Sequence, residues 1–248
     1  MRAILTWHSL DRSGSPISVP PDEFRRQVEW LTASGVRAVT VEKLLALPDE
    51  EDAAALTFDD GFANFGEEAA PVLGEYGIPA TIFVVTGHVG RDNRWGGRDT
   101  PGIPSLPLLG WDALARLREA GMALGAHTRT HPRLPGLDPD TLESEIGGAA
   151  RDMEQHLGSR PDGFAYPYGD LDPASARVVE RSYQWACTTE LRALEGPARR
   201  HQLPRLDAWY LREPARRAGW GSRAFRTWLW CRRQGRRARA AWRGQVSR

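Results

Sequence analysis

Short apolar runs alternate with amphipathic segments over most of the chain. Eight runs of three to six residues predict buried strands, at 3–7, 36–39, 53–58, 80–85, 123–126, 164–166, 185–188 and 203–206. Six segments between them predict helices, at 21–34, 41–47, 64–76, 112–120, 139–157 and 173–183. Strands that alternate with helices are typical of parallel βα units, and seven or eight such units can close into a barrel.

The helix predicted at 139–157 has the clearest pattern. Its buried face consists of Leu142, Ile146, Ala149, Met153 and Leu157. Asp138 is the expected N-cap, Pro139 suits the first turn, and Gly158 suits the end. The segment 87–109, in contrast, is rich in glycine and proline and has neither pattern. A loop of this length in a compact domain is often a functional lid.

The composition predicts a single large domain. The 248 residues are 41% hydrophobic, which is enough for one large core. No stretch approaches the ~20 apolar residues of a spanning helix, and the first apolar run is too short for a signal peptide. Cys187 and Cys231 are far apart in sequence, so a disulfide framework is not expected. These features predict a cytoplasmic protein.

The net charge of +1 hides an asymmetry along the chain. Residues 214–248 contain 11 arginines and no acidic residue, so residues 1–213 carry a net charge of −10. We therefore predict a barrel at 1–212 and a basic, Arg/Trp-rich helical tail at 213–248.

Three interpretations of this tail stay open. It can contact an anionic membrane at its inner face, because basic helices with tryptophan lie well in that interface. It can cover the acidic barrel as a terminal helix. Nucleic-acid binding is the third, and the acidic body, which repels phosphates, argues against it.

Two adjacent carboxylates follow the predicted strand 53–58. In the sequence Thr57-Phe58-Asp59-Asp60-Gly61, burial of both acids requires a cation or a proton. If one of them binds a metal ion, its neighbour can stay free as a base. The alternative is a turn in which an aspartate caps a helix N-terminus.

Two histidines follow the predicted strand 123–126 in the same way. His127 and His131 are four residues apart, a spacing that suits chelation. The alternative is a pair of surface histidines. Because two histidines and one carboxylate form a known hydrolytic metal set, the two motifs together predict a metal-dependent hydrolase. These ligands suit several divalent ions and do not identify the metal.

At this point the chain resembles a known family. The two motifs, followed by Phe164-Ala165-Tyr166-Pro167-Tyr168-Gly169, are similar in order and spacing to the polysaccharide deacetylases of carbohydrate esterase family 4. The resemblance covers about residues 3–210. It implies a distorted (β/α)7–8 barrel that deacetylates N-acetylated sugars. It also implies that Asp59 is the catalytic base and that Asp60, His127 and His131 bind the metal. Zinc is the ion expected first, and cobalt, nickel, manganese and iron suit the same ligands.

The chain departs from the family pattern in two places. Ala165 stands where many members have an arginine that orients the base. We expect Arg205 to replace it, the alternative being a surface salt bridge. The late Leu-x-His motif is missing, and Leu5-Thr6-Trp7-His8 resembles its counterpart in a circularly permuted branch that includes poly-N-acetylglucosamine deacetylases. His8 is therefore the expected general acid, the alternative being a core histidine.

The third motif predicts the substrate contacts. Tyr166, Pro167 and Tyr168 would line the site, and the backbone N–H of Tyr168 would stabilise an oxyanion. Trp95 and Trp111 are candidate stacking surfaces for a sugar, with core packing as the alternative.

Three functions remain after this reasoning. The first is removal of an acetyl group, N-linked before O-linked, from a sugar, polysaccharide or lipid-linked glycan. The second is a metal-dependent amidase that acts on a non-sugar amide or imide. The third is a carbohydrate-binding barrel without activity.

Overall fold

The computed structural model describes residues 1–196, 199–211, 216 and 218–246. Its centre is a parallel sheet with the strand order β7-β6-β5-β4-β3-β1-β8. The strands of this order are β1 (Arg2–Trp7), β3 (Ala53–Phe58), β4 (Ala80–Val84), β5 (Ala123–Ala126), β6 (Gly163–Ala165), β7 (Trp185–Cys187) and β8 (Leu206–Asp207). The short strand β2 (Arg37–Ala38) pairs with the first residues of β3.

A short, broken segment joins the two ends of this curled sheet. Leu203 exchanges backbone hydrogen bonds with β7, whereas Leu206 and Asp207 pair with β1 on the other side. Pro204 lies between them, and because proline has no N–H it cannot continue a strand ladder. The strand predicted at 203–206 is therefore a single bridge followed by a two-residue strand. The predicted distorted barrel is confirmed. Its two ends are joined here by one bridge at Leu203 and two paired residues of β8.

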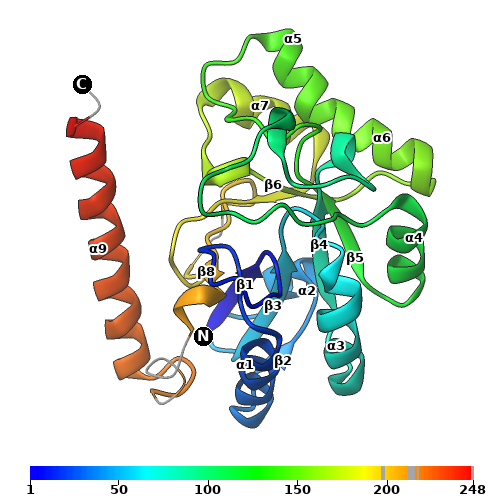
Figure 1. Cartoon of the computed structure of the whole chain (residues 1–248). Coiled ribbons are helices and arrows are strands. Elements are labelled where there is room, and N and C mark those ends of the chain that lie inside the picture. Colours follow the sequence, from blue (N-terminus) through cyan, green and yellow to red (C-terminus); the bar gives the residue numbers. More distant parts are fainter. Residues whose placement is uncertain (197–198, 212–215, 217, 247–248) are drawn as a thin grey trace.

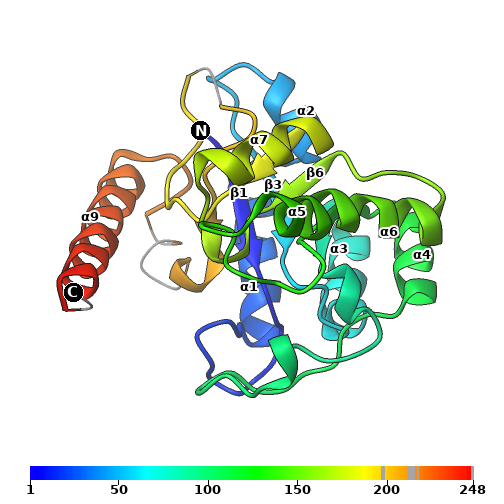
Figure 2. The same cartoon turned by 90° about the horizontal axis from the view of Figure 1, so that it is seen from above.

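Helices surround the sheet (Figure 1, Figure 2). The α-helices are α1 (Pro21–Ala33), α2 (Val41–Ala46), α3 (Ala70–Tyr76), α4 (Trp111–Glu119), α5 (Pro139–Leu142), α6 (Gly148–Leu157), α7 (Pro173–Ser182) and α9 (Arg223–Val246). Two π-helical turns, η1 (Phe65–Ala69) and η4 (Glu143–Gly147), precede α3 and α6. The short 3₁₀ turns are η2 (Thr86–His88), η3 (Trp95–Gly97), η5 (Pro167–Gly169) and η6 (Ala208–Tyr210). The helix predicted at 139–157 is thus α5 and α6 joined by a π turn.

Side-chain alternation along the strands carries polar groups to one end of the barrel. One buried cluster takes residues from several strands, among them Ile4, Ala55 and Phe83, and forms the interior. Because successive strand residues point to opposite faces, the interior face continues from Ile4 to His8 and from Ala55 to Asp59. The residues that follow β1 and β3 therefore meet at the C-terminal ends of the strands.

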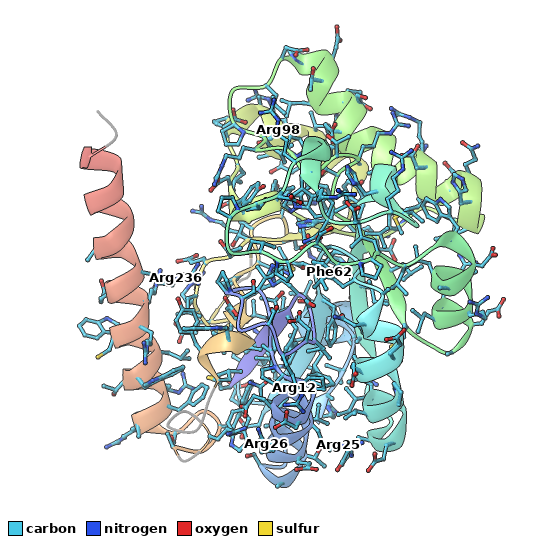
Figure 3. The ribbon with its side chains drawn as sticks, viewed as in Figure 1. Arg12, Arg25, Arg26, Phe62, Arg98 and Arg236 are labelled. Atoms are coloured by element: carbon cyan, nitrogen blue, oxygen red, sulfur yellow. The ribbon has the colours of Figure 1, made fainter. Side chains whose placement is uncertain are left out.

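The helix α9 runs along one side of the barrel, as Figure 1 shows. Phe225 and Leu229 are buried against the body, and Arg233 forms an ion pair with Glu190. Arg236 points toward the body in Figure 3. Its guanidinium lies 5.7 Å from the ring centre of Tyr210. The first turns of the tail thus pack on the barrel as a terminal helix.

Two further expectations from the sequence concern the domain boundary and membrane-spanning helices. The predicted domain boundary between residues 212 and 213 lies outside the described residues. Over the residues that the structure describes, no helix is long and apolar enough to span a membrane.

Candidate active site

Asp59 is held by Arg205 in the barrel interior. The guanidinium donates from Nη1 to Oδ1 at 2.6 Å and from Nη2 to Oδ2 at 2.8 Å. Both side chains are almost completely buried. Burial raises the pKa of Asp59 and is the largest single influence, but the charge and hydrogen bonds of Arg205, together with the nearby His127 and His8, outweigh it and hold this pKa well below its usual range. Asp59 is therefore an ionised carboxylate at neutral pH.

Arg205 is itself fixed by the strand ends around it. Its Nε donates to the carbonyl oxygen of Thr188 at 3.0 Å, and its Nη1 donates to the hydroxyl oxygen of Thr6 at 3.0 Å. An arginine that is 1% exposed is not a surface salt-bridge residue. The structure thus places Arg205 against the predicted base, where the sequence interpretation expected it.

Asp60, His127 and His131 meet beside Asp59. The Oδ1 of Asp60 lies 3.5 Å from Nε2 of His127 and 3.4 Å from Nε2 of His131. This is a group of potential metal ligands found among the described residues, with ligand atoms within 4.8 Å of one another. All three are buried, and Oδ1 of Asp60 has no hydrogen-bond partner among the residues that the structure describes.

The protonation states suit a cation at these atoms. Burial and the nearby His127 lower the pKa of His131 well below its usual value, so its imidazole is neutral. The Nδ1 of His127 lies 2.7 Å from the carbonyl oxygen of Ala165, which leaves the Nε2 lone pair directed toward Asp60. The neutral imidazole of His131, Nε2 of His127 and a carboxylate oxygen to which no described residue is bonded are the donors that a zinc-like ion requires.

The backbone of the three motifs is strained. Among the described residues, four non-glycine residues have a positive φ: Asp60 (70°), Thr128 (65°), His131 (61°) and Tyr168 (61°). Each such conformation costs about 1–3 kcal/mol, and strain of this kind is concentrated at functional sites. The fold therefore holds these loops in conformations that their residues disfavour.

A cleft of about 230 Å³ opens onto these groups. Nε2 of His8 lies 3.7 Å from Oδ2 of Asp59 at its edge, and the ring of His8 is partly exposed. Tyr168 is 46% exposed and also lines the cleft. Trp95 stacks on His131 with 4.6 Å between ring centres and an interplanar angle of 23°. The predicted metal ligands, base and acid therefore share one cavity.

Two predicted contacts are corrected by the structure. Tyr166 does not line the cleft: it is buried edge-on against Phe164 beneath the helices, because these two residues share one face of the strand. Pro167 is buried and is also absent from the cleft lining. For the candidate Trp111 the structure supports the alternative of packing, because its ring stacks on His156 of α6 with 4.2 Å between ring centres.

The sequence interpretation missed several residues that line the cleft. They are Ile17, Asn93, Thr100, Ile103 and Thr189. Three of them belong to the long segment 87–109, which its length and composition marked as a lid. The others lie in loops without a recognisable motif, so no signal in one sequence distinguished them.

Comparison with known proteins agrees with this geometry. The family profile described as "Polysaccharide deacetylase" matches residues 46–183, which is more than half of the chain. The chain belongs to the polysaccharide deacetylase family. The matched region contains the Asp59-Asp60 motif, both histidines and the third motif.

Curated relatives of this family member are similar over most of its length. YxkH of Bacillus subtilis (strain 168), which bears the family name, is 28% identical over 193 residues, covering 75% of this chain and 64% of its own. A poly-beta-1,6-N-acetyl-D-glucosamine N-deacetylase of Staphylococcus epidermidis is 26% identical over 203 residues, covering 76% of this chain and 67% of that protein. The chain therefore spans about two thirds of the length of these relatives.

Solved structures have the same fold. IcaB from Ammonifex degensii superposes with a TM-score of 0.71 at 24% identity, covering 84% of this chain and 94% of that one. The Streptococcus pyogenes deacetylase PplD, solved in complex with acetate, gives a TM-score of 0.70 at 22% identity and covers 83% and 91%. The curled parallel sheet is thus the fold of these two proteins as well.

Proposed function

We propose that this protein hydrolyses the N-acetyl group of a sugar with the help of a divalent ion, zinc in the first instance. One observation carries the proposal. Asp59 is an ionised carboxylate held by Arg205, and it takes no part in the adjacent group of Asp60, His127 and His131. A base beside a complete set of metal ligands is what amide hydrolysis requires, whereas binding of a sugar alone does not need it.

Each residue has a defined part in this reaction. An ion held by Asp60, His127 and His131 would supply Lewis-acid chemistry, polarising a carbonyl and acidifying a water. Asp59 takes the proton of the attacking water. His8, at the edge of the same cleft, donates a proton to the departing amine. The backbone N–H of Tyr168 donates to the developing oxyanion.

The names of the relatives suggest the first substrate to test, a β-1,6-linked N-acetylglucosamine oligomer. We expect the protein to release acetate from this oligomer after reconstitution with zinc, and to stop after chelation. An O-acetylated glycan and a non-sugar amide or imide are assayed beside it. Preference for the non-sugar compound would replace the sugar deacetylase with an amidase. No acetate from any of them with bound zinc would favour a binding protein without activity.

We further propose that α9 contacts an anionic membrane from the cytoplasmic side. Trp230 is 60% exposed, and Arg223 and Arg226 are exposed on the same helix. A tryptophan accompanied by arginines suits a lipid interface, where each cation near the surface contributes about 1 kcal/mol. Cys187 and Cys231 are both free, which agrees with a reducing compartment.

Vesicle co-sedimentation of the full chain tests this contact. We expect binding to phosphatidylglycerol vesicles, weak binding to phosphatidylcholine vesicles, and loss of binding in Trp230→Ala/Arg223→Gln. Arg25→Gln, on α1, removes a surface charge far from α9 in the sequence and is the matched control. Equal sedimentation of the variant and the natural sequence would exclude the membrane. Tighter binding to an oligonucleotide than to vesicles would favour nucleic acid instead.

A further inference from the structure

The loop that carries His131 needs external support. Thr128 and His131 have φ values of 65° and 61°. This left-handed backbone conformation costs a residue other than glycine about 1–3 kcal/mol. Within the loop, the N–H of His131 donates to the hydroxyl oxygen of Thr128 at 3.0 Å. The hydroxyl of Thr128 also donates to the carbonyl oxygen of His127 at 2.5 Å. Neither bond holds the two residues between Thr128 and His131, which are Arg129 and Thr130.

Glu145 supplies that support from outside the loop. Its Oε2 accepts the backbone N–H of Arg129 at 3.0 Å and that of Thr130 at 2.9 Å, and its Oε1 accepts the hydroxyl of Thr130 at 2.8 Å. The residue is only 9% exposed. A largely buried carboxylate with three hydrogen bonds is strongly fixed, because bonds to a charged acceptor are stronger than neutral ones.

The opposite edge of the loop is held by the segment after β4. The N–H of Thr86 donates to the carbonyl of Thr128 at 3.1 Å, and the N–H of Gly87 donates to the carbonyl of Arg129 at 2.8 Å. A Cβ on Gly87 would lie 2.6 Å from that carbonyl oxygen, so only glycine permits this approach. The loop is therefore clamped by its carbonyls on one side and by its N–H groups on the other.

The side chain of Arg129 is held by α6. Its Nε donates to Oδ2 of Asp152 at 2.8 Å, and the hydroxyl of Thr86 donates to the same oxygen at 2.7 Å. A Cβ on Gly148 would lie 2.8 Å from Nε of Arg129, so the helix has a glycine where this side chain crosses it. Glu145 of η4 and Asp152 of α6 thus both bind the same loop.

The π turn η4 places Glu145 for this contact. A π turn accommodates one more residue than an α-helical turn, and such turns occur frequently at functional sites. Leu142 before η4 and Met153 after it are both buried. The turn therefore directs a carboxylate at the loop while the apolar residues on either side keep their place in the core.

We propose that Glu145 is a positioning residue that pre-forms the metal site. By fixing Arg129 and Thr130, it keeps His131 in its left-handed conformation, facing Asp60 and His127. An ion then binds without rearrangement of the backbone. This proposal rests on the metal site of the proposed function, and it concerns the affinity for the ion and not the hydrolytic step.

The test is zinc affinity in the variant Glu145→Gln, measured on the full chain by competition with a chromophoric chelator. The amide keeps the size of the side chain but replaces one acceptor by a donor that faces other donors. We expect the dissociation constant for zinc to rise by about 10–100-fold, the usual effect of groups that orient metal ligands. At saturating zinc, acetate release should return to that of the natural sequence.

Glu143→Gln is the matched control. Glu143 belongs to the same π turn, has a side chain that is 47% exposed, and pairs with Arg151 and not with the loop. Its loss should leave zinc affinity unchanged. The milder variant Thr130→Val removes one of the three bonds to Glu145 and should weaken zinc binding less, which preserves the test if Glu145→Gln does not fold.

Unchanged zinc affinity in folded Glu145→Gln, whatever its melting temperature, would overturn the proposal and make Glu145 a purely structural residue. The proposal also fails if Glu143→Gln weakens binding equally. If the natural sequence binds zinc but releases no acetate, the proposed function fails, whereas the role of Glu145 stands or falls on its own affinity measurement.

Discussion

Asp59 and Asp60 are adjacent in the chain, yet their surroundings are opposite. Asp59 has both oxygens bonded to Arg205, which lowers its pKa. Asp60 has an Oδ1 without a hydrogen-bond partner, and burial raises its pKa. The backbone differs as well, because Asp60 has a φ of 70° and Asp59 does not have a positive φ. The turn of direction between them sends one carboxylate to the arginine and the other to the histidines.

The difference shows how one motif can supply two chemical roles. A base has to be ionised and oriented by the protein itself, so its partners are protein groups. A ligand needs an oxygen that no protein group has taken, because a buried carboxylate without a partner is stabilised by a cation. Identical side chains thus differ in role through their partners, as is common among catalytic acids.

Exchange of each carboxylate for its amide tests this comparison most directly. Asp59→Asn should keep zinc and lose about 10²–10⁴-fold in acetate release, the usual effect of a general base. Asp60→Asn should lose zinc, because an amide oxygen is a weaker ligand than a carboxylate. Zinc content after dialysis, the rate of acetate release and circular dichroism are measured for both. Loss of zinc from folded Asp59→Asn would mean that Asp59 is also a metal ligand, and the distinction between a base and a ligand in this motif would be wrong.

The second prediction concerns the partner of the base. Arg205→Met leaves the buried Asp59 carboxylate without a counter-charge, which should lower the free energy of unfolding by about 3–5 kcal/mol. Burial then raises the pKa of Asp59, so the acid side of the pH–rate profile should move to higher pH.

A double-mutant cycle in urea checks this assignment. In the Asp59→Asn background, Arg205→Met should cost much less, because no charge is left unpaired. An equal cost in both backgrounds would show that Arg205 stabilises the barrel through Thr6 and Thr188 and not through the base.

The strand ends were predictable from the sequence for a physical reason. Apolar runs mark strands, and each motif follows such a run, so Asp59 and His127 had to lie at the same end of a parallel sheet. The error at Tyr166 came from treating the third motif as one wall. Alternation along β6 places Tyr166 on the same face as Phe164, away from the cleft.

Other features leave no trace in a single sequence. The apolar spacing in 139–157 is that of an ordinary α-helix, so it cannot reveal the π turn η4 or the role of Glu145. The closure of the barrel depends on which neighbour each residue around Pro204 pairs with, and this is decided by tertiary packing.

Asp172 extends the comparison to a carboxylate that water can reach. Its pKa is lowered to about 2, first by the backbone N–H of Ser175, which donates to Oδ1 at 2.8 Å at the start of α7. Asp172→Ala should lower the free energy of unfolding by about 1 kcal/mol at pH 7, the usual loss for an N-cap. The cost is smaller than at Arg205 because water can replace the lost partner at a partly exposed position.

The pH dependence separates charge from hydrogen bonding at Asp172. Because its folded pKa of about 2 is below the unfolded value of 3.8, the stabilisation due to its charge is present above pH 3.8 and is lost as the pH falls toward 2. Asp172→Asn keeps a capping side chain that does not titrate. Its free energy of unfolding in urea should therefore be closer to that of the natural sequence at pH 3 than at pH 7. If the gap between them does not change with pH, the cap acts through its hydrogen bonds alone, and the parallel with the charged pair of Asp59 and Arg205 ends there.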